Sequence, residues 1–266
     1  MPKIPGRMFL RNLVGRRALL FQLVRRDFQQ RFVGSAAGWL WAVIHPLVLL
    51  LSWTFVFQVC LRVRPPGIEH YTLFLFCGFL PWLLFQETVQ RSASALLEHS
   101  NLITKTVFPA EVVPVSIFLS SLINHLIGLG LAIVAVVIVL RQISATILFL
   151  PLYMFLVGLF AVGLGWIVSG LNVYLRDTAQ AINVVLILWF WMTPIFITEQ
   201  QVPARFRFVL YANPLSFVVR AYRDRLMTAR WPDIAELAIL AAYGVAAFVI
   251  GGLFFRHLKR GFADVL

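Results

Sequence analysis

The sequence predicts an all-α integral membrane protein with six transmembrane helices. Hydrophobic residues make up 61% of the 266 residues and charged residues only 13%, whereas a soluble domain is about half apolar and about a quarter charged. The mean hydropathy is +0.86. Several apolar runs reach the ~20 residues that a helix needs to cross a hydrocarbon core. Together these observations indicate a multi-pass membrane protein.

Residues 1–36 form a basic cytoplasmic segment, with eight arginines and lysines against one acid, Asp27. Between Ala18 and Phe32 apolar residues recur at helical spacing, which is typical of an amphipathic helix lying on headgroups. The net charge of +12 suits anionic phospholipids better than nucleic acid, because the basic residues flank apolar spans. The residues expected to hold this interface helix are Arg25, Arg26, Phe28 and Phe32.

Six apolar segments follow and define a transmembrane domain of residues 37–258, with a cytoplasmic tail of residues 259–266. The predicted spans are about 38–61, 71–91, 112–140, 146–171, 179–198 and 234–255. Pro81 is expected to break the second span, because proline removes a helical hydrogen bond. An even number of spans returns the C-terminus to the cytoplasm, where Arg256, Lys259 and Arg260 follow the positive-inside tendency.

Residues 199–233 would lie outside by this count, yet they carry six arginines. Short helices dipping into the outer leaflet before the last span explain this, because backbone at that depth must be helical or covered by protein. Arg220, Arg223 and Arg225 would then bind an anionic diphosphate bidentately, or their charges would snorkel to the headgroups. The apolar helical face expected here comprises Leu215, Val218, Val219, Tyr222 and Leu226.

A polar island at residues 98–114 separates the second and third spans and holds Lys105, the one lysine between Lys3 and Lys259. A short helix here would present Leu102, Ile103 and Val107 as an apolar face, with Glu98, Asn101 and Lys105 around it. Such a helix at the membrane surface suits docking of a soluble partner. An ordinary loop between two spans explains the island equally well.

Motifs of catalysis and metal binding are scarce in this chain. It has no G-x-x-x-x-G-K-[ST] and no H-E-x-x-H, so ATP is not expected to bind to a P-loop of its own. Ion-driven carriers bury carboxylates near the midplane, whereas most acids here lie near the ends of predicted spans or in loops, and Glu87, late in the second span, is the least comfortably placed. A membrane-embedded glycan-modifying enzyme would use Glu87 with His125, although an interhelical hydrogen bond is the expected role of His125.

Aromatic and small residues suggest two further features of the spans. The aromatic residues that would line a pathway or gate are Trp82, Phe85, Trp189 and Tyr211, although interfacial anchoring explains most aromatics as well. Gly158, Ala161, Gly165 and Ser169 step by three or four along the fourth span. This spacing predicts close helix packing, either within the subunit or across a dimer.

Five stretches in this order resemble the ABC-2 type permeases that export polysaccharides and polyol phosphates, namely O-antigen, capsule and teichoic acid exporters. The stretches are R-D-F-Q-Q-R-F-V-G-S-A-A-G-W-L-W-A-V-I-H-P from Arg26, F-C-G-F-L-P-W, N-L-I-T-K-T-V-F-P-A-E-V-V-P, L-R-D after the fourth span and Y-A-N-P-L before the last. The resemblance covers residues 20–255 and is specific as an ordered set.

The resemblance implies a homodimeric permease of the bacterial inner membrane, paired with a separate ABC ATPase that binds ATP and Mg²⁺. This chain itself would carry no cofactor, no metal and no catalytic residue. In such families the island holds a coupling helix, so residues 98–110 would contact the ATPase, while residues 199–230 would form an outer gate. The implied substrate is a glycan on a polyprenyl diphosphate carrier, an O-antigen first and capsule or teichoic acid second.

Overall fold

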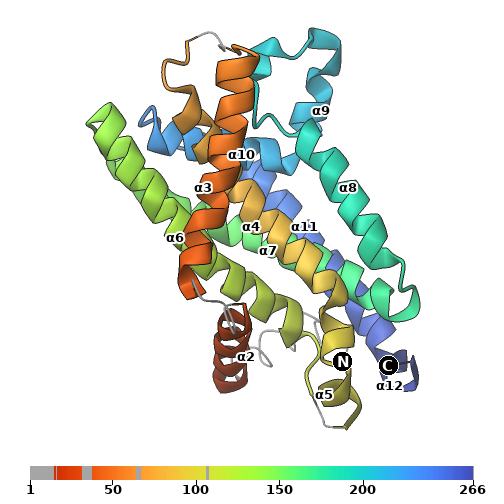
Figure 1. Ribbon diagram of the computed structural model, residues 1–266. Coiled ribbons are helices and arrows are strands. Elements are labelled where there is room, and N and C mark those ends of the chain that lie inside the picture. Colours follow the sequence, from red (N-terminus) through yellow and green to blue (C-terminus); the bar gives the residue numbers. More distant parts are fainter. Residues whose placement is uncertain (1–14, 16, 32–37, 64–66, 106–107, 266) are drawn as a thin grey trace.

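The computed structural model describes residues 15, 17–31, 38–63, 67–105 and 108–265, and within them it is helical with no β-strand (Figure 1). The α-helices are α2 (Arg17–Gln30), α3 (Trp41–Thr54), α4 (Tyr71–Glu98), α5 (Ser100–Lys105), α6 (Val112–Leu140), α7 (Leu150–Tyr174), α8 (Thr178–Met192), α9 (Arg207–Ala212), α10 (Pro214–Leu226), α11 (Ile234–Leu258) and α12 (Phe262–Val265). Shorter turns are η1 (Gly38–Leu40), η2 (Phe55–Cys60, a π-helix), η3 (Ala145–Phe149), η4 (Glu199–Gln201), η5 (Ala204–Phe206) and η6 (Lys259–Gly261).

Five helical segments of the described chain are long and apolar enough to cross a membrane. They are Trp41–Cys60, Tyr71–Glu98, Val112–Leu140, Ala145–Tyr174 and Ile234–Gly261. The segment predicted as the fifth span, 179–198, is helical only over Thr178–Met192. Its 15 residues make a helix of about 22 Å. The helix ends early because Pro194 disfavours helical backbone in the residue before it.

The predicted break at Pro81 is wrong, because α4 runs unbroken from Tyr71 to Glu98. Proline at this position removes one backbone donor, and the surrounding helices hold α4 in place along its length. Leu80, Pro81 and Trp82 are all buried. The helix also continues seven residues beyond the predicted end at Arg91, since no proline or glycine follows until Pro109.

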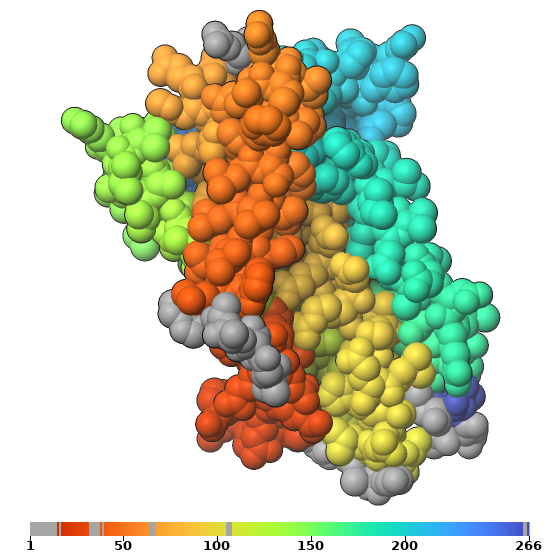
Figure 2. All heavy atoms as spheres, in the orientation of Figure 1, coloured from red at the N-terminus to blue at the C-terminus, as the bar shows by residue number. Residues whose placement is uncertain are grey.

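The helices form a bundle with two distinct ends (Figure 1). At one end, here the α5 end, α2, α5 and α12 lie together, and Lys259 Nζ binds Glu111 Oε2 at 2.5 Å. At the other, the α9 end, lie α9 and the turns η4 and η5. Figure 2 shows α3 lying over one face, with part of α4 visible between α3 and α8. The exposed residues of α3 and α8 are largely apolar, as expected of surfaces that meet lipid or another chain.

The small residues of α7 pack within this one chain. A Cβ on Gly158 would lie 2.4 Å from the ring of Phe118 on α6, and one on Gly165 would lie 2.9 Å from Ser92 Oγ on α4. On another side of α7, a Cβ on Gly163 would lie 2.3 Å from the carbonyl oxygen of Ala247 on α11. Glycine therefore lets α7 lie close to α4, α6 and α11. The close packing predicted for these small residues thus occurs within the subunit.

Two short helices occupy the arginine-rich segment before the last span, as predicted. The residues of its expected apolar face, Leu215, Val218, Val219, Tyr222 and Leu226, are all buried. Asn213 caps α10 by accepting a hydrogen bond from the Leu215 amide at 3.0 Å. The helix that begins at Pro214 is thereby fixed against the bundle through its apolar side.

Candidate functional site

Four charged side chains join α2 to α4 at the α5 end. Arg31 pairs with Glu87 and lies 3.5 Å from Asp27, while Arg91 pairs with Asp27 and lies 3.7 Å from Glu87. Arg31 also donates to Ser121 Oγ of α6 at 3.3 Å. The amphipathic helix is therefore held by a charge-balanced cluster between two of the spans, in addition to its apolar side.

Asp27 carries a full charge in this cluster. Burial alone would raise the pKa of its carboxyl, but the hydrogen bond from Arg91 and the charges of Arg91 and Arg31 hold that pKa below its ordinary value. The net direction matches the geometry, since both arginines face the carboxylate.

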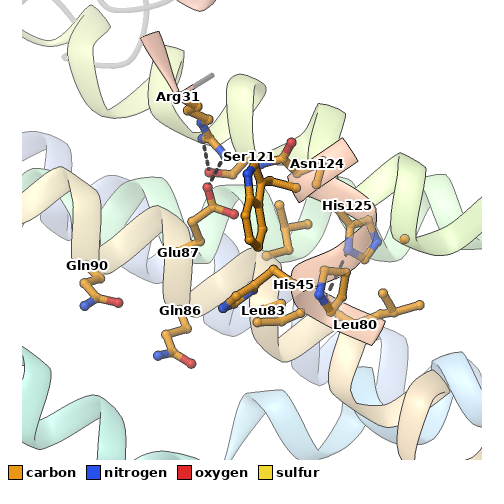
Figure 3. A pocket seen from close by; sticks show the side chains of 15 residues that line it. Arg31, His45, Leu80, Leu83, Gln86, Glu87, Gln90, Ser121, Asn124 and His125 are labelled. Carbon is orange, nitrogen blue, oxygen red and sulfur yellow. Dashed lines mark hydrogen bonds and ion pairs between the residues drawn. The ribbon is translucent and has the colours of Figure 1, made fainter. Parts of the chain in front are cut away.

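A cavity of about 370 Å³ opens beside this cluster between α2, α3, α4 and α6. Figure 3 shows Arg31 and Glu87 on one side of it, His125 and Leu80 on the other, and Ser121 and Asn124 between them. The remaining lining residues are Trp41, Ala42, His45, Pro46, Leu83, Leu84, Gln86, Gln90 and Gly128. Its wall thus runs from the α5 end to the middle of α6, and mixes apolar with mostly uncharged polar groups.

His125 links this cavity to α10. Its Nδ1 lies 3.2 Å from the carbonyl oxygen of Leu80, and its Nε2 lies 2.8 Å from the hydroxyl of Tyr222. Because a carbonyl can only accept, Nδ1 donates, and Nε2 accepts from Tyr222 in a neutral imidazole. The predicted interhelical hydrogen bond of His125 is confirmed, and it connects α4, α6 and α10.

The three arginines of α10 bind three different sets of partners. Arg220 pairs with Glu199 of η4 at 2.5 Å and with Glu236 of α11. Arg225 donates to the Tyr153 hydroxyl of α7 at 3.0 Å. Each of these arginines therefore joins α10 to a neighbouring element, in addition to any contact with headgroups or substrate.

Arg223 differs from the other two arginines because it binds backbone carbonyls of neighbouring segments. It donates to the carbonyl oxygens of Pro194 at 2.7 Å, Ile195 at 2.6 Å and Phe74 at 3.2 Å, and its Cζ lies 3.4 Å from the centre of the Phe74 ring. Gly78 makes room for it, since a Cβ there would lie 2.5 Å from Nη2. Within the described residues no carboxylate lies within ion-pair distance of Arg223.

The polar island contains the expected short helix, α5, at the very end of the bundle. Glu98 and Asn101 are exposed and Leu102 is half-buried. Ile103 packs against a core cluster of this chain that includes Leu96 and Phe262, so only part of its surface is open to a partner. Val107 and the side chain of Lys105 lie outside the described part of the chain.

The segment predicted as an interface helix is helical as α2, and Leu23 is its one buried residue. Arg25 and Arg26 are exposed and Phe28 is half-buried, while Phe32 lies outside the described residues. Asp27 and Arg31, which tie the helix down, were not among the predicted site residues. Their spacing of four, matched by the four-residue spacing of Glu87 and Arg91, was the signal that could have identified them.

The four aromatic residues proposed for the pathway lie in different surroundings. Trp82 and Phe85 are fully buried in the core of this chain. Trp189 is partly buried and donates to Asn213 Oδ1 at 2.9 Å, while Tyr211 is exposed on α9. The structure brings Phe85 and Trp189 together, with ring centres 5.2 Å apart. A pathway role for these residues stays a prediction.

The ABC-2 type transporter family matches residues 18–227. The chain belongs to this family. It is 30% identical over 258 residues to the O-antigen export system permease protein RfbA of Myxococcus xanthus, covering 96% of this chain and 98% of that one. A protein of the same name from Klebsiella pneumoniae is 28% identical over 93% of this chain and 95% of its own. The polysialic acid transport protein KpsM of Escherichia coli is 22% identical over 88% and 91%.

These relatives are transport permeases, and the geometry agrees with a transport role for this chain. Glu87 and His125 line the same cavity, as the glycan-modifying enzyme would need. However, Glu87 is paired with Arg31 and Arg91, and His125 is bonded to Leu80 and Tyr222. Both groups are therefore engaged in holding helices together rather than poised for acid–base chemistry.

Proposed function

We propose that this chain is the membrane subunit of an ATP-driven exporter of lipid-linked polysaccharide, with O-antigen as the first candidate. The similarity to O-antigen export permeases carries the proposal, because it runs over 96% of this chain and 98% of the relative. The similarity to KpsM keeps capsule export as the alternative. Hydrolysis of ATP would take place on a separate nucleotide-binding subunit, since the chain has no P-loop sequence.

We further propose six spans, with α8 as the fifth and α10 as a re-entrant helix entering from outside. The bond from Tyr222 to His125 supports re-entry, because His125 lies near the middle of α6 (Val112–Leu140). The shortness of α8 fits a span completed by the extended residues that follow it. The α5 end would face the cytoplasm of a bacterial inner membrane, and the apolar faces of α3 and α8 would meet lipid or a second copy in a homodimer.

Labelling of single cysteines tests this topology. With Cys60 and Cys77 replaced, cysteines at Leu10 and Arg260 should react only with reagents that reach the cytoplasm. A cysteine at Arg205, which is exposed at the α9 end, should react from outside. Reaction of Leu10 and Arg260 from opposite sides would contradict an even number of spans.

The docking role of α5 is tested by Leu102→Asp. A buried apolar anchor contributes more to an interface than a rim charge, roughly 2 kcal/mol or more against about 0–1 kcal/mol. We therefore expect Leu102→Asp to abolish most stimulation of ATP hydrolysis by the permease in vesicles, and to stop glycan export. Lys105→Ala should retain both.

Asn101→Ala is the matched control for this experiment, because Asn101 is exposed on the same helix. Membrane levels and melting temperature should be equal in all three variants. Ile103 is unsuitable as a test position, since it also packs on the core of this chain. Normal ATPase stimulation and export by Leu102→Asp would contradict the docking role.

A further inference from the structure

The charges beside the cavity between α2, α3, α4 and α6 are already balanced. Arg31 and Glu87 line the wall, and with Asp27 and Arg91 they form two positive and two negative groups in mutual contact. A diphosphate or carboxylate entering the cavity would have to break one of these pairs. The cavity therefore offers no spare positive charge to an anionic ligand.

Uncharged polar groups are available in the same wall. The Oδ1 atom of Asn124 is buried and has no hydrogen-bond partner in the described part of the protein. His45 and Gln90 line the cavity from α3 and α4 and remain exposed. A buried amide oxygen without a partner destabilises a protein, so such a group calls for a partner from a ligand or from water.

Apolar surface completes the cavity. Trp41, which is 51% exposed, lies in the wall with Pro46 and Leu83. The volume of about 370 Å³ falls in the range of small-molecule sites, roughly 300–1,000 Å³, which are mostly apolar with a few polar groups that fix orientation. A sugar ring matches this combination, because it has an apolar C–H face and a rim of hydroxyls that both donate and accept.

We propose that this cavity binds an uncharged sugar residue of the transported glycan, with Asn124 bonded to a sugar hydroxyl and Trp41 against the ring. The inference rests on the proposed function and adds a location and a ligand class to it. His125, in the same wall, bonds to Tyr222 of α10. A residue of the sugar site is therefore hydrogen-bonded directly to α10, the helix proposed to re-enter from outside.

Asn124→Leu distinguishes a binding role of Asn124 from a structural one. A binding role predicts that glycan export falls while the melting temperature does not. Leucine has nearly the size of asparagine and removes an unpartnered polar atom, so the melting temperature should stay constant or rise. Glycan export should fall by about fivefold, as expected for one lost hydrogen bond to substrate. Thr54→Val is the control, since Thr54 Oγ1 of α3 is also buried without a partner and does not line the cavity.

Photocrosslinking tests the site without altering Asn124. In cells that make the lipid-linked glycan, Trp41 is replaced by p-benzoylphenylalanine, which keeps an aromatic ring at the cavity. After illumination the protein should carry an adduct detected by antiserum against the glycan. The same amino acid at Val48, an exposed position of α3 outside the cavity, should give no adduct that this antiserum detects.

The outcomes distinguish the sugar site from the proposed function. Normal export by Asn124→Leu, or a Trp41 adduct that contains only phospholipid or glycan-free carrier, would overturn the sugar site. If deletion of the permease also left export intact, the proposed function itself would fail. Loss of export on deletion with a glycan adduct at Trp41 supports both.

Discussion

Gly251→Ala is expected to lower the melting temperature of the purified permease by about 10 °C. An alanine Cβ at this position would lie 2.1 Å from the carbonyl oxygen of Gly163, far below the 3.0 Å that real Cβ atoms respect. The clashing atom belongs to the backbone of α7, so no side-chain rotation can relieve the overlap. Separation of α7 from α11 would cost about 3 kcal/mol or more, which corresponds to about 10 °C in a chain of this size.

Gly252→Ala is the matched control, because it changes the neighbouring residue of the same helix. Its Cβ would lie 3.5 Å from the Trp166 ring, an ordinary contact, and alanine is the better helix former. This variant should melt at the wild-type temperature or slightly above. Gly244→Ala, with a Cβ 2.9 Å from the Leu156 carbonyl, should fall between the two. Equal melting temperatures for all three would contradict the close approach of α7 and α11.

The helices themselves could be predicted from the sequence, because apolar length alone defines most of them. The third span was predicted at 112–140, and α6 is observed at Val112–Leu140, since Pro109 precedes it, Pro114 lies in its first turn, where proline is tolerated, and a polar turn follows it. The effects of Pro81 and Pro194 on their helices were predicted wrongly, since the helix continues through Pro81 and ends before Pro194. The first lies within a helix supported by its neighbours on all sides, and the second ends a helix whose outer face is largely exposed.

The pairing of side chains between helices was harder to predict, because sequence spacing reports only neighbours on one helix. Glu87 was singled out as the least comfortably placed acid, yet its partner Arg31 directly follows α2, 56 positions away in the chain. Likewise Tyr222 was assigned to an apolar face, and its hydroxyl reaches His125 of α6. Such contacts depend on how the helices pack, which hydropathy does not encode.

The arginines of α10 show a further limit of reasoning from sequence. Snorkelling needs only a long charged side chain and tolerates lysine, whereas bidentate phosphate binding requires arginine. The structure adds a third requirement, because Arg223 alone serves three backbone carbonyls with Nε, Nη1 and Nη2. Lysine has a single nitrogen and cannot reach all three. A failed lysine substitution at this position is therefore no longer a sign of phosphate binding.

Arg223→Ala is expected to destabilise the permease by about 3 kcal/mol or more and to stop export. It would leave the carbonyls of Pro194 and Ile195 without this donor, and each buried acceptor left unpaired costs about 1–3 kcal/mol. Arg223→Lys should recover only part of the loss. Melting temperature and export are to be measured on the same preparations. If Arg223 acts only by bonding to these backbone carbonyls, both should fall together.

Arg220→Lys and Arg205→Ala are the controls for the two Arg223 variants. Arg220 binds two carboxylates, and a lysine can keep an ion pair there, so most stability and export should remain. Arg205 is exposed, and its removal should change stability by no more than about 0.5 kcal/mol. Export lost in Arg223→Lys at an unchanged melting temperature would contradict this purely structural role and favour contact with an anionic carrier, because the loss would then not come from weakened backbone bonds.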